Sequence, residues 1–177
     1  HGLLQQGPLL PSARLGQLEL AHGTLLPDTV RGTQHLQVGA DSPRLQLRLL
    51  QSLCAPVTVA GPVGGVEVAD SIVGLGLADG TPAPALDAPE APLDLQRASF
   101  FGAVHALSLN ASDCIFDAPV RAERRQVGCV RFCYVPPSSQ VPRRYRCQPQ
   151  LESEARIAAL GPNPTQAEKD AVRAEVG

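Results

Sequence analysis

A short apolar pattern recurs along the chain and constrains the fold more than any other feature of the sequence. Each copy has an apolar–polar–apolar strand, a short polar step, and a small residue followed by mostly apolar residues. The strands are Leu18-Glu19-Leu20, Leu47-Arg48-Leu49, Val66-Glu67-Val68, Leu93-Asp94-Leu95 and Leu107-Ser108-Leu109. The small residues that follow them are Thr24, Ser52, Ser71, Ser99 and Cys114. Alternation at period two places one side of each strand in a core and the other side in solvent.

A third short strand follows several copies, at Val57-Thr58-Val59, Val104-His105-Ala106 and Val120-Arg121-Ala122. Three very short strands separated by tight bends build one coil of a parallel β-helix, whose coils stack because none can bury its apolar face alone. We therefore predict an all-β fold, a short right-handed parallel β-helix, since parallel crossovers are overwhelmingly right-handed. A β-sandwich is the alternative, but sandwiches have longer strands and more hairpin turns of the Asp-Gly kind.

The repeat is irregular, which a solenoid tolerates if insertions leave the coil as loops. Pro-rich stretches within residues 27–43 and 79–89 are the insertions we expect. Hydrophobic residues make up 44% of the chain but aromatic residues only 3%, with no Trp and no Met. Such a core must consist of medium-sized side chains stacked in rows, which also favours a regular solenoid.

The sequence changes character after Pro149. Residues 151–160 have helical spacing and end at Gly161-Pro162, and Thr165 with Glu168 forms a capping box for a second helix over residues 166–176. We divide the chain into an N-terminal extension (1–14), a β-helix (15–149) and a helical appendage (150–177). The helices are expected to close the open C-terminal coil, because an uncapped solenoid end exposes both core and strand edge.

The segment from residue 121 to residue 147 is locally basic, with one acidic residue, Glu123, in a chain of net charge −2. Together with Tyr134 and Tyr145, its arginines form a candidate surface for phosphate, carboxylate or an acidic partner. The alternative is that they lie on the outer face of strands and pair with acidic residues of neighbouring coils. The seven arginines are Arg121, Arg124, Arg125, Arg131, Arg143, Arg144 and Arg146.

Five cysteines leave at least one thiol unpaired, and their spacing matches no known disulfide framework. Small buried thiols are one interpretation, and a disulfide between Cys129 and Cys147 is the other. A structural zinc ion requires four ligands, whereas Cys129, Cys133 and Cys147 supply three sulfurs. If their segment is a strand, Cys129 and Cys133 lie about 13 Å apart, which is too far to share an ion. We predict no metal and no cofactor.

Many β-helices cleave acidic polysaccharides, using carboxylates from neighbouring coils as metal ligands or as acid and base. Asp70, Asp113 and Asp117 lie beside the predicted bends and are the residues to consider for such a site. Carboxylates at bends more commonly cap turns in solvent, so we assign no catalytic residue. The net charge gives no general attraction to nucleic acid, and no apolar run reaches the ~20 residues of a membrane span.

Residues 128–137 (GCVRFCYVPP), together with residues 142–149 (PRRYRCQP) and residues 18–27 (LELAHGTLLP), form a distinctive set of motifs. They resemble a family of uncharacterised bacterial proteins from organisms with phage-tail-like contractile injection systems, sometimes labelled baseplate proteins. The resemblance spans residues 15–175, with Cys133 standing where the family suggests Ser. It implies a pectate-lyase-like right-handed β-helix inside a larger protein and supplies no catalytic residue.

These observations predict a non-catalytic structural or interaction module of a larger bacterial assembly, with a carbohydrate-active β-helix as the alternative. Its expected partners are other protein subunits or further copies of itself, with neither membrane nor nucleic acid. The chain starts at His1-Gly2-Leu3 without Met or a signal peptide. We therefore expect a fragment of a longer protein, from an assembly in the cytoplasm.

Overall fold

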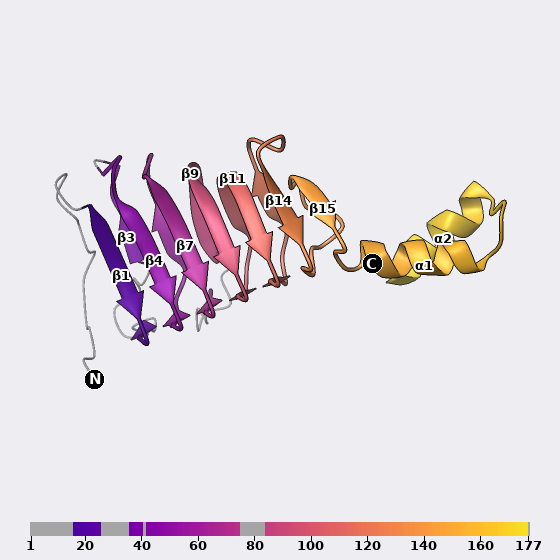
Figure 1. Cartoon of the computed structure of the whole chain (residues 1–177), viewed down its shortest axis with the longest axis horizontal. Coiled ribbons are helices and arrows are strands. Elements are labelled where there is room, and N and C mark those ends of the chain that lie inside the picture. The colour runs from indigo at the N-terminus through magenta and orange to yellow at the C-terminus, as the bar shows by residue number, and fades with distance from the viewer. Residues whose placement is uncertain (1–15, 26–35, 41, 75–83, 177) are drawn as a thin grey trace.

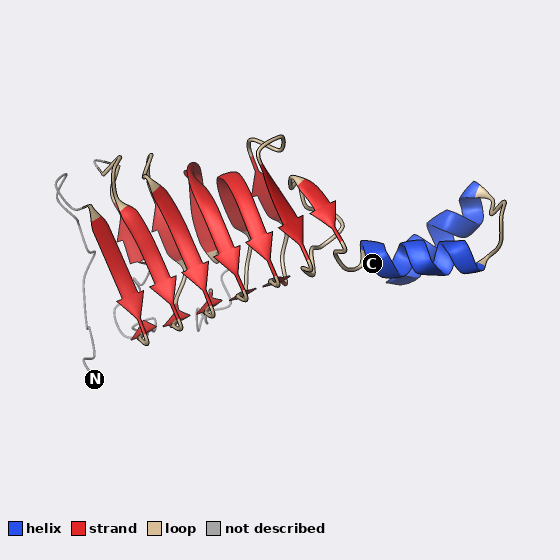
Figure 2. Cartoon of the chain, viewed as in Figure 1, coloured by secondary structure: helices blue, strands red, loops and turns tan. Residues whose placement is uncertain are grey.

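A computed structural model describes residues 16–25, 36–40, 42–74 and 84–176, and the predicted N-terminal extension lies outside these ranges. The chain is mostly β-strand and ends in two helices (Figure 2). The principal sheet is a row of strands that ends before the two helices (Figure 1). Its members, in spatial order, are β1 (Gln17–Ala21), β4 (Gln46–Leu50), β7 (Gly65–Ala69), β9 (Leu86–Gln96), β11 (Val104–Ser112), β14 (Gly128–Arg131) and β15 (Arg143–Tyr145).

Two further rows of strands complete the β region. The second sheet contains β2 (Thr24–Leu25), β5 (Leu53–Cys54), β8 (Ile72–Val73), β10 (Ser99–Phe100) and β12 (Ile115–Phe116). The third row contains β3 (Leu36–Val38), β6 (Val57–Val59), the first residues of β9 and β11, and β13 (Val120–Ala122). Every strand pair in the described part is parallel, which excludes there the antiparallel hairpins of a sandwich.

The predicted strands are present, with three errors of register. Thr24 and Ser99 were predicted to match Ser52 and Ser71. They pair instead with the residues that follow these serines, Leu53 and Ile72, so both predictions are one position too late. The fifth strand is displaced by two, because Leu109 and not Leu107 pairs with Leu93. The Pro-rich stretches also hold strands, since β3 and the start of β9 fall within residues 27–43 and 79–89; parts of both stretches lie outside the described residues.

One turn is repeated after each strand of the principal sheet. Its first residue is a non-glycine residue with a positive φ of 48–57°, namely His22, Gln51, Asp70, Arg97, Asp113, Phe132 and Arg146. The next residue is always small: Gly23, Ser52, Ser71, Ala98, Cys114, Cys133 and Cys147. A left-handed residue redirects the chain by a sharp angle, and a small successor can turn inward without overfilling the core.

Hydroxyl and thiol groups in these turns connect successive coils. The Ser71 hydroxyl donates to the Ala69 carbonyl oxygen at 2.7 Å and accepts from the Ser52 amide at 3.0 Å. The Cys133 thiol donates to the Arg131 carbonyl oxygen at 3.1 Å and accepts from the Cys114 amide at 3.3 Å. The same role is thus filled by serine in the N-terminal coils and by cysteine in the C-terminal coils.

The interior is filled mainly by Leu, Val and Ala in aligned rows, as the composition predicts. One row passes through Leu49, Val68, Leu95, Ala111 and Val130, which occupy matching positions on neighbouring strands. Two large side chains also face inward. Phe100 and Phe116 are both buried and stack with their ring centroids 5.1 Å apart.

The C-terminal helices are α1 (Gln150–Ala159) and α2 (Gln166–Val176), close to the predicted bounds. The predicted capping box is present, because the Thr165 amide donates to Glu168 at 2.7 Å and the Glu168 amide donates to the Thr165 hydroxyl at 3.3 Å. Only Ser153 is buried in the two helices, and they extend beyond β15, so most of their surface does not cover the last coil (Figure 1). Neither helix has the length and apolarity needed to cross a membrane.

Candidate functional site

The seven arginines of the basic segment do not form one cluster. Arg131 on β14 and Arg143 on β15 belong to the principal sheet and are exposed, and Arg146 occupies the turn after β15. Arg124 and Arg125 lie exposed in the loop between β13 and β14. The predicted surface is therefore reduced to the arginines that surround the last two strands of the principal sheet.

Arg121 and Arg144 have other environments. Arg121 lies in the third row of strands and forms an ion pair with Glu123 at 2.9 Å. Arg144 pairs with Val130 in the register of β14 and β15, so it continues the inward row of the core. It is half-buried and donates to the Ser139 carbonyl oxygen at 3.1 Å. A polar side chain at this position ends the apolar row.

Two arginines of the N-terminal coils, Arg48 and Arg97, are in contrast neutralised by carboxylates of adjacent strands. Arg48 contacts Glu19 at 2.9 Å and Glu67 at 2.8 Å. Arg97 binds both carboxylate oxygens of Asp70, at 2.6 and 2.9 Å, and these hydrogen bonds hold the pKa of Asp70 below its ordinary value. Ion pairs between neighbouring coils, which the sequence suggested for residues 121–147, are thus formed by Arg48 and Arg97 instead.

Six arginines of the basic segment have no carboxylate within 4.0 Å among the described residues: Arg124, Arg125, Arg131, Arg143, Arg144 and Arg146. In the described part of the chain, Arg121 alone of the seven forms an ion pair, with the acidic residue of its own segment. The described residues therefore show no pairing of these arginines with acidic residues of neighbouring coils, although Arg131 donates to the Ser112 hydroxyl of the preceding coil at 3.3 Å.

Large apolar side chains are exposed beside these unpaired arginines. Phe132 is 50% exposed, Tyr145 is 49% exposed and Tyr134 is 40% exposed. The rings of Phe132 and Tyr145 meet edge to face with centroids 5.7 Å apart, and the Arg146 guanidinium lies 5.6 Å from the Tyr145 ring centroid. We call the set Arg131, Phe132, Tyr145 and Arg146 the arginine–aromatic surface, whereas Tyr134 lies in register with Ile115 of the second sheet.

Phe132 is held at a position of the turn that disfavours its side chain. Its φ of 55° is in the left-handed region, which costs a non-glycine residue about 1–2 kcal/mol. Half of its side chain remains exposed, so burial offsets this cost only in part. Sequence reasoning identified Tyr134 and Tyr145 but missed Phe132. Phe132 could have been found from its position next to Cys133. If Cys133 faces inward as the small residue of a turn, the residues on both sides of it face outward.

The disulfide considered as an alternative, between Cys129 and Cys147, is absent, and all five cysteines are free thiols. Cys129 precedes the buried Val130 and therefore lies on the outer side of β14, whereas Cys147 is buried in the inward row of turn residues. The two thiols lie on opposite sides of the sheet. Burial raises the pKa of Cys54 to about 11, and the hydrogen bond to Cys114 raises that of Cys133 to about 12, so both stay protonated at neutral pH.

The three aspartates considered for polysaccharide cleavage do not converge. Asp70 binds Arg97, the Asp113 carboxylate accepts from the Ser112 hydroxyl at 2.7 Å, and Asp117 accepts from the Gly102 amide at 2.7 Å. All three stabilise or flank turns.

The structure pairs two other carboxylates, Glu67 on β7 and Asp94 on β9, in register on the outer face. They line an open hollow of about 440 Å³, and Asp94 also lines a neighbouring one of about 280 Å³ that includes Cys129 and Arg131. Glu67 is already bound to Arg48. Sequence reasoning overlooked this pair, although each residue is the central polar residue of a repeat strand.

No family model matches the chain, and comparisons with curated proteins and with solved structures give no match either. Function must therefore be argued from the geometry of the described residues.

Proposed function

We propose that the three rows of parallel strands form a right-handed β-helix, which serves as a non-catalytic interaction module of a larger bacterial assembly, of the phage-tail-like kind that the family resemblance implies. The arginine–aromatic surface is its contact site. Support comes from the contrast between Arg48 and Arg97, which pair with carboxylates of adjacent strands, and the arginines beside exposed aromatic residues in the last coils, which have no such partner among the described residues. Tyr, Phe and Arg are enriched in the centres of protein–protein interfaces, where each can contribute strongly to binding.

A second copy of this chain is the partner that the charge distribution favours. Seven of the 15 basic residues but one of the 17 acidic residues lie within residues 121–147. This segment therefore has a net charge of +6, and the rest of the chain has a net charge of −8. Opposite potentials on two parts of the same molecule favour a head-to-tail contact, in which the basic part of one copy meets the acidic part of the next.

Nucleic acid is a weaker candidate for the same surface. The rest of the chain would repel a polyanion over distances up to the Debye length of about 10 Å. Acidic protein surfaces carry a lower charge density and can combine carboxylates with the apolar side chains that Phe132 and Tyr145 require.

Sedimentation velocity at several protein concentrations tests the proposed contact. We expect the chain to self-associate at about 50 mM salt and to dissociate at about 500 mM salt, since screening weakens exposed charge pairs. The double variant Phe132→Ser/Arg146→Gln should weaken association at least about tenfold, because it removes an aromatic and a charged contact. Phe101→Ser is the matched control, as Phe101 is equally exposed at 49% but lies outside the surface. Equal losses in both variants would contradict the assignment.

A carbohydrate-active β-helix is the second candidate, and the in-register pair Glu67 and Asp94 is the observation that favours it. Such an enzyme would depolymerise a uronic acid polymer, and Asp94→Asn would abolish the reaction. The ion pair of Glu67 with Arg48 argues against it, because the hydrogen bonds to arginine occupy the carboxylate oxygens that a substrate or metal ion would have to reach.

A further inference from the structure

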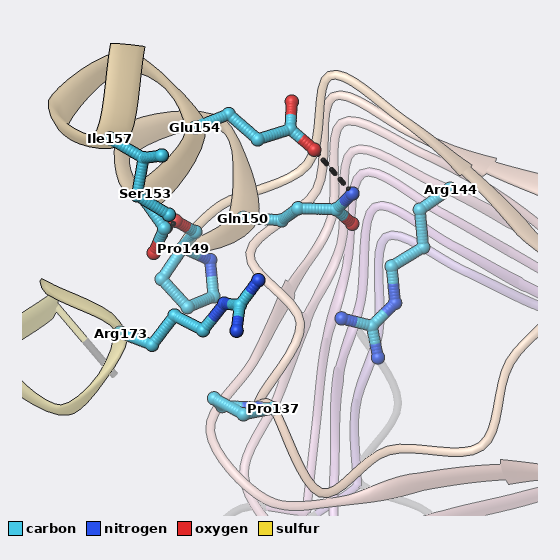
Figure 3. Close-up of a pocket in the computed structure, with 8 residues that line it drawn as sticks. All are labelled: Pro137, Arg144, Pro149, Gln150, Ser153, Glu154, Ile157 and Arg173. Atoms are coloured by element: carbon cyan, nitrogen blue, oxygen red, sulfur yellow. Dashed lines mark hydrogen bonds between the residues drawn. The ribbon is translucent and has the colours of Figure 1, made fainter. Parts of the chain in front are cut away.

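A hollow lies between the last coil and the helical hairpin, and none of its lining residues belongs to the arginine–aromatic surface. Its volume is about 360 Å³, and its walls come from the turn at Pro137, from β15, from α1 and from α2. This volume falls within the range of small-molecule sites. The hollow is shown in Figure 3 with its lining residues labelled.

Two guanidinium groups enter this hollow from different elements. Arg144 comes from β15 and Arg173 from α2, and Figure 3 shows both side chains directed toward the space above Pro137. Arg144 makes one hydrogen bond in the described part, to the Ser139 carbonyl oxygen, and Arg173 makes one, to Asp170 at 3.0 Å. Since guanidinium carries five N–H donors, most donors of both groups remain free for a ligand.

The only carboxylate in the lining does not neutralise either arginine. Glu154 instead accepts a hydrogen bond of 2.7 Å from the Gln150 side chain (Figure 3). Arg173 forms an ion pair with Asp170, which is not part of the lining, and Arg144 has no carboxylate within 4.0 Å among the described residues. An anion placed between the two arginines would accept charge-assisted hydrogen bonds from both sides.

The remaining walls are suited to an organic ligand rather than a bare ion. Pro137, Pro149 and Ile157 supply apolar surface next to the two guanidinium groups. The amides at the start of α1 contribute little, because those of Leu151 and Glu152 already donate to Cys147 and to the Gln148 side chain. The site therefore depends on the arginine side chains and on their apolar surroundings.

We propose that this hollow binds a small organic dianion, a phosphate monoester or a dicarboxylate, with its anionic groups between Arg144 and Arg173. The apolar part of the ligand packs on the prolines and on Ile157. Because α1 and α2 hold two walls, the ligand also fixes the helical hairpin against the last coil.

Titration calorimetry with phenyl phosphate, glutarate, inorganic phosphate and acetate tests this site. We expect saturable binding of phenyl phosphate or glutarate, weaker binding of inorganic phosphate, and acetate at least about tenfold weaker than the best dianion. The preferred dianion shows whether phosphate or dicarboxylate is recognised. Absence of saturable binding by every dianion, or acetate binding as tightly as the dianions, would overturn the proposal.

Variants locate the binding. Arg173→Gln, on an exposed helix, should weaken dianion binding at least about tenfold, and Arg144→Gln should do the same. Arg124→Gln removes an exposed arginine that is not part of the lining and should leave binding unchanged. Thermal unfolding shows whether each variant is folded. If Arg144→Gln does not fold, the effect of Arg173→Gln on dianion binding is the deciding result. Binding that Arg173→Gln leaves intact would show that the anion is held elsewhere.

Discussion

Replacing Gly128 with alanine is expected to destabilise the chain by about 3 kcal/mol or more, because two separate costs combine. Gly128 has a φ of +103°, a conformation that L side chains rarely adopt. A Cβ atom at this position would also collide with the Leu109 carbonyl oxygen on the adjacent strand. That oxygen cannot move away easily, since β11 pairs with strands on both sides. Urea unfolding followed by circular dichroism measures the loss.

Gly161→Ala is the matched control for this substitution. Gly161 has a similar φ of +111°, but nothing lies within 4 Å of a Cβ built there. Its replacement should therefore cost about 1 kcal/mol, the backbone term alone. A Gly128→Ala variant as stable as Gly161→Ala would show that β14 does not approach β11 as closely as described.

Phe116→Ala should cost about 3–5 kcal/mol, a large part of the 5–15 kcal/mol that stabilises a typical domain. Phe116 is fully buried and stacks on Phe100 with an angle of 15° between the rings. Successive coils are held at the strand spacing of about 4.8 Å by their backbone hydrogen bonds, so neighbouring side chains cannot collapse into the space left by the ring. Thermal unfolding gives the change in free energy.

Phe101→Ala serves as the control for Phe116→Ala. Phe101 follows Phe100 directly but is 49% exposed, so its removal should cost less than about 1 kcal/mol. Comparable losses from the two substitutions would mean that the second sheet does not face the core as the structure has it.

Most strands were predictable from the sequence because alternation fixes which residues face inward. The register was harder to predict. Ser52, Ser71 and Cys114 were recognised as equivalent turn residues, but in the other two predicted repeats this place is taken by Gly23 and Ala98 rather than by Thr24 and Ser99. The inward position requires a small side chain but no hydroxyl group. Thr24 and Ser99 have a hydroxyl and follow directly after Gly23 and Ala98, which is why the prediction fell one residue too late.

Other features depend on contacts between residues far apart in sequence. The start of β9 lies in a Pro-rich stretch, and it becomes a strand because β6 and β11 pair with it on either side. The paired state of an arginine likewise depends on which residue the neighbouring coil places beside it. Arg48 meets Glu19 and Glu67 in register, whereas Arg143 meets Cys129. Counting charges along the sequence cannot separate these cases.

A mixing experiment tests the proposed contact between copies most directly. The Phe132→Ser/Arg146→Gln variant loses the arginine–aromatic surface but keeps the acidic remainder of the chain, so it can occupy the surface of a wild-type copy without extending further. Head-to-tail association then predicts that the variant alone is monomeric at about 100 µM, and that an excess of it reduces wild-type oligomers to small complexes at low salt. Wild-type protein that is monomeric at this concentration, or a variant that associates like wild type, would contradict the proposed function.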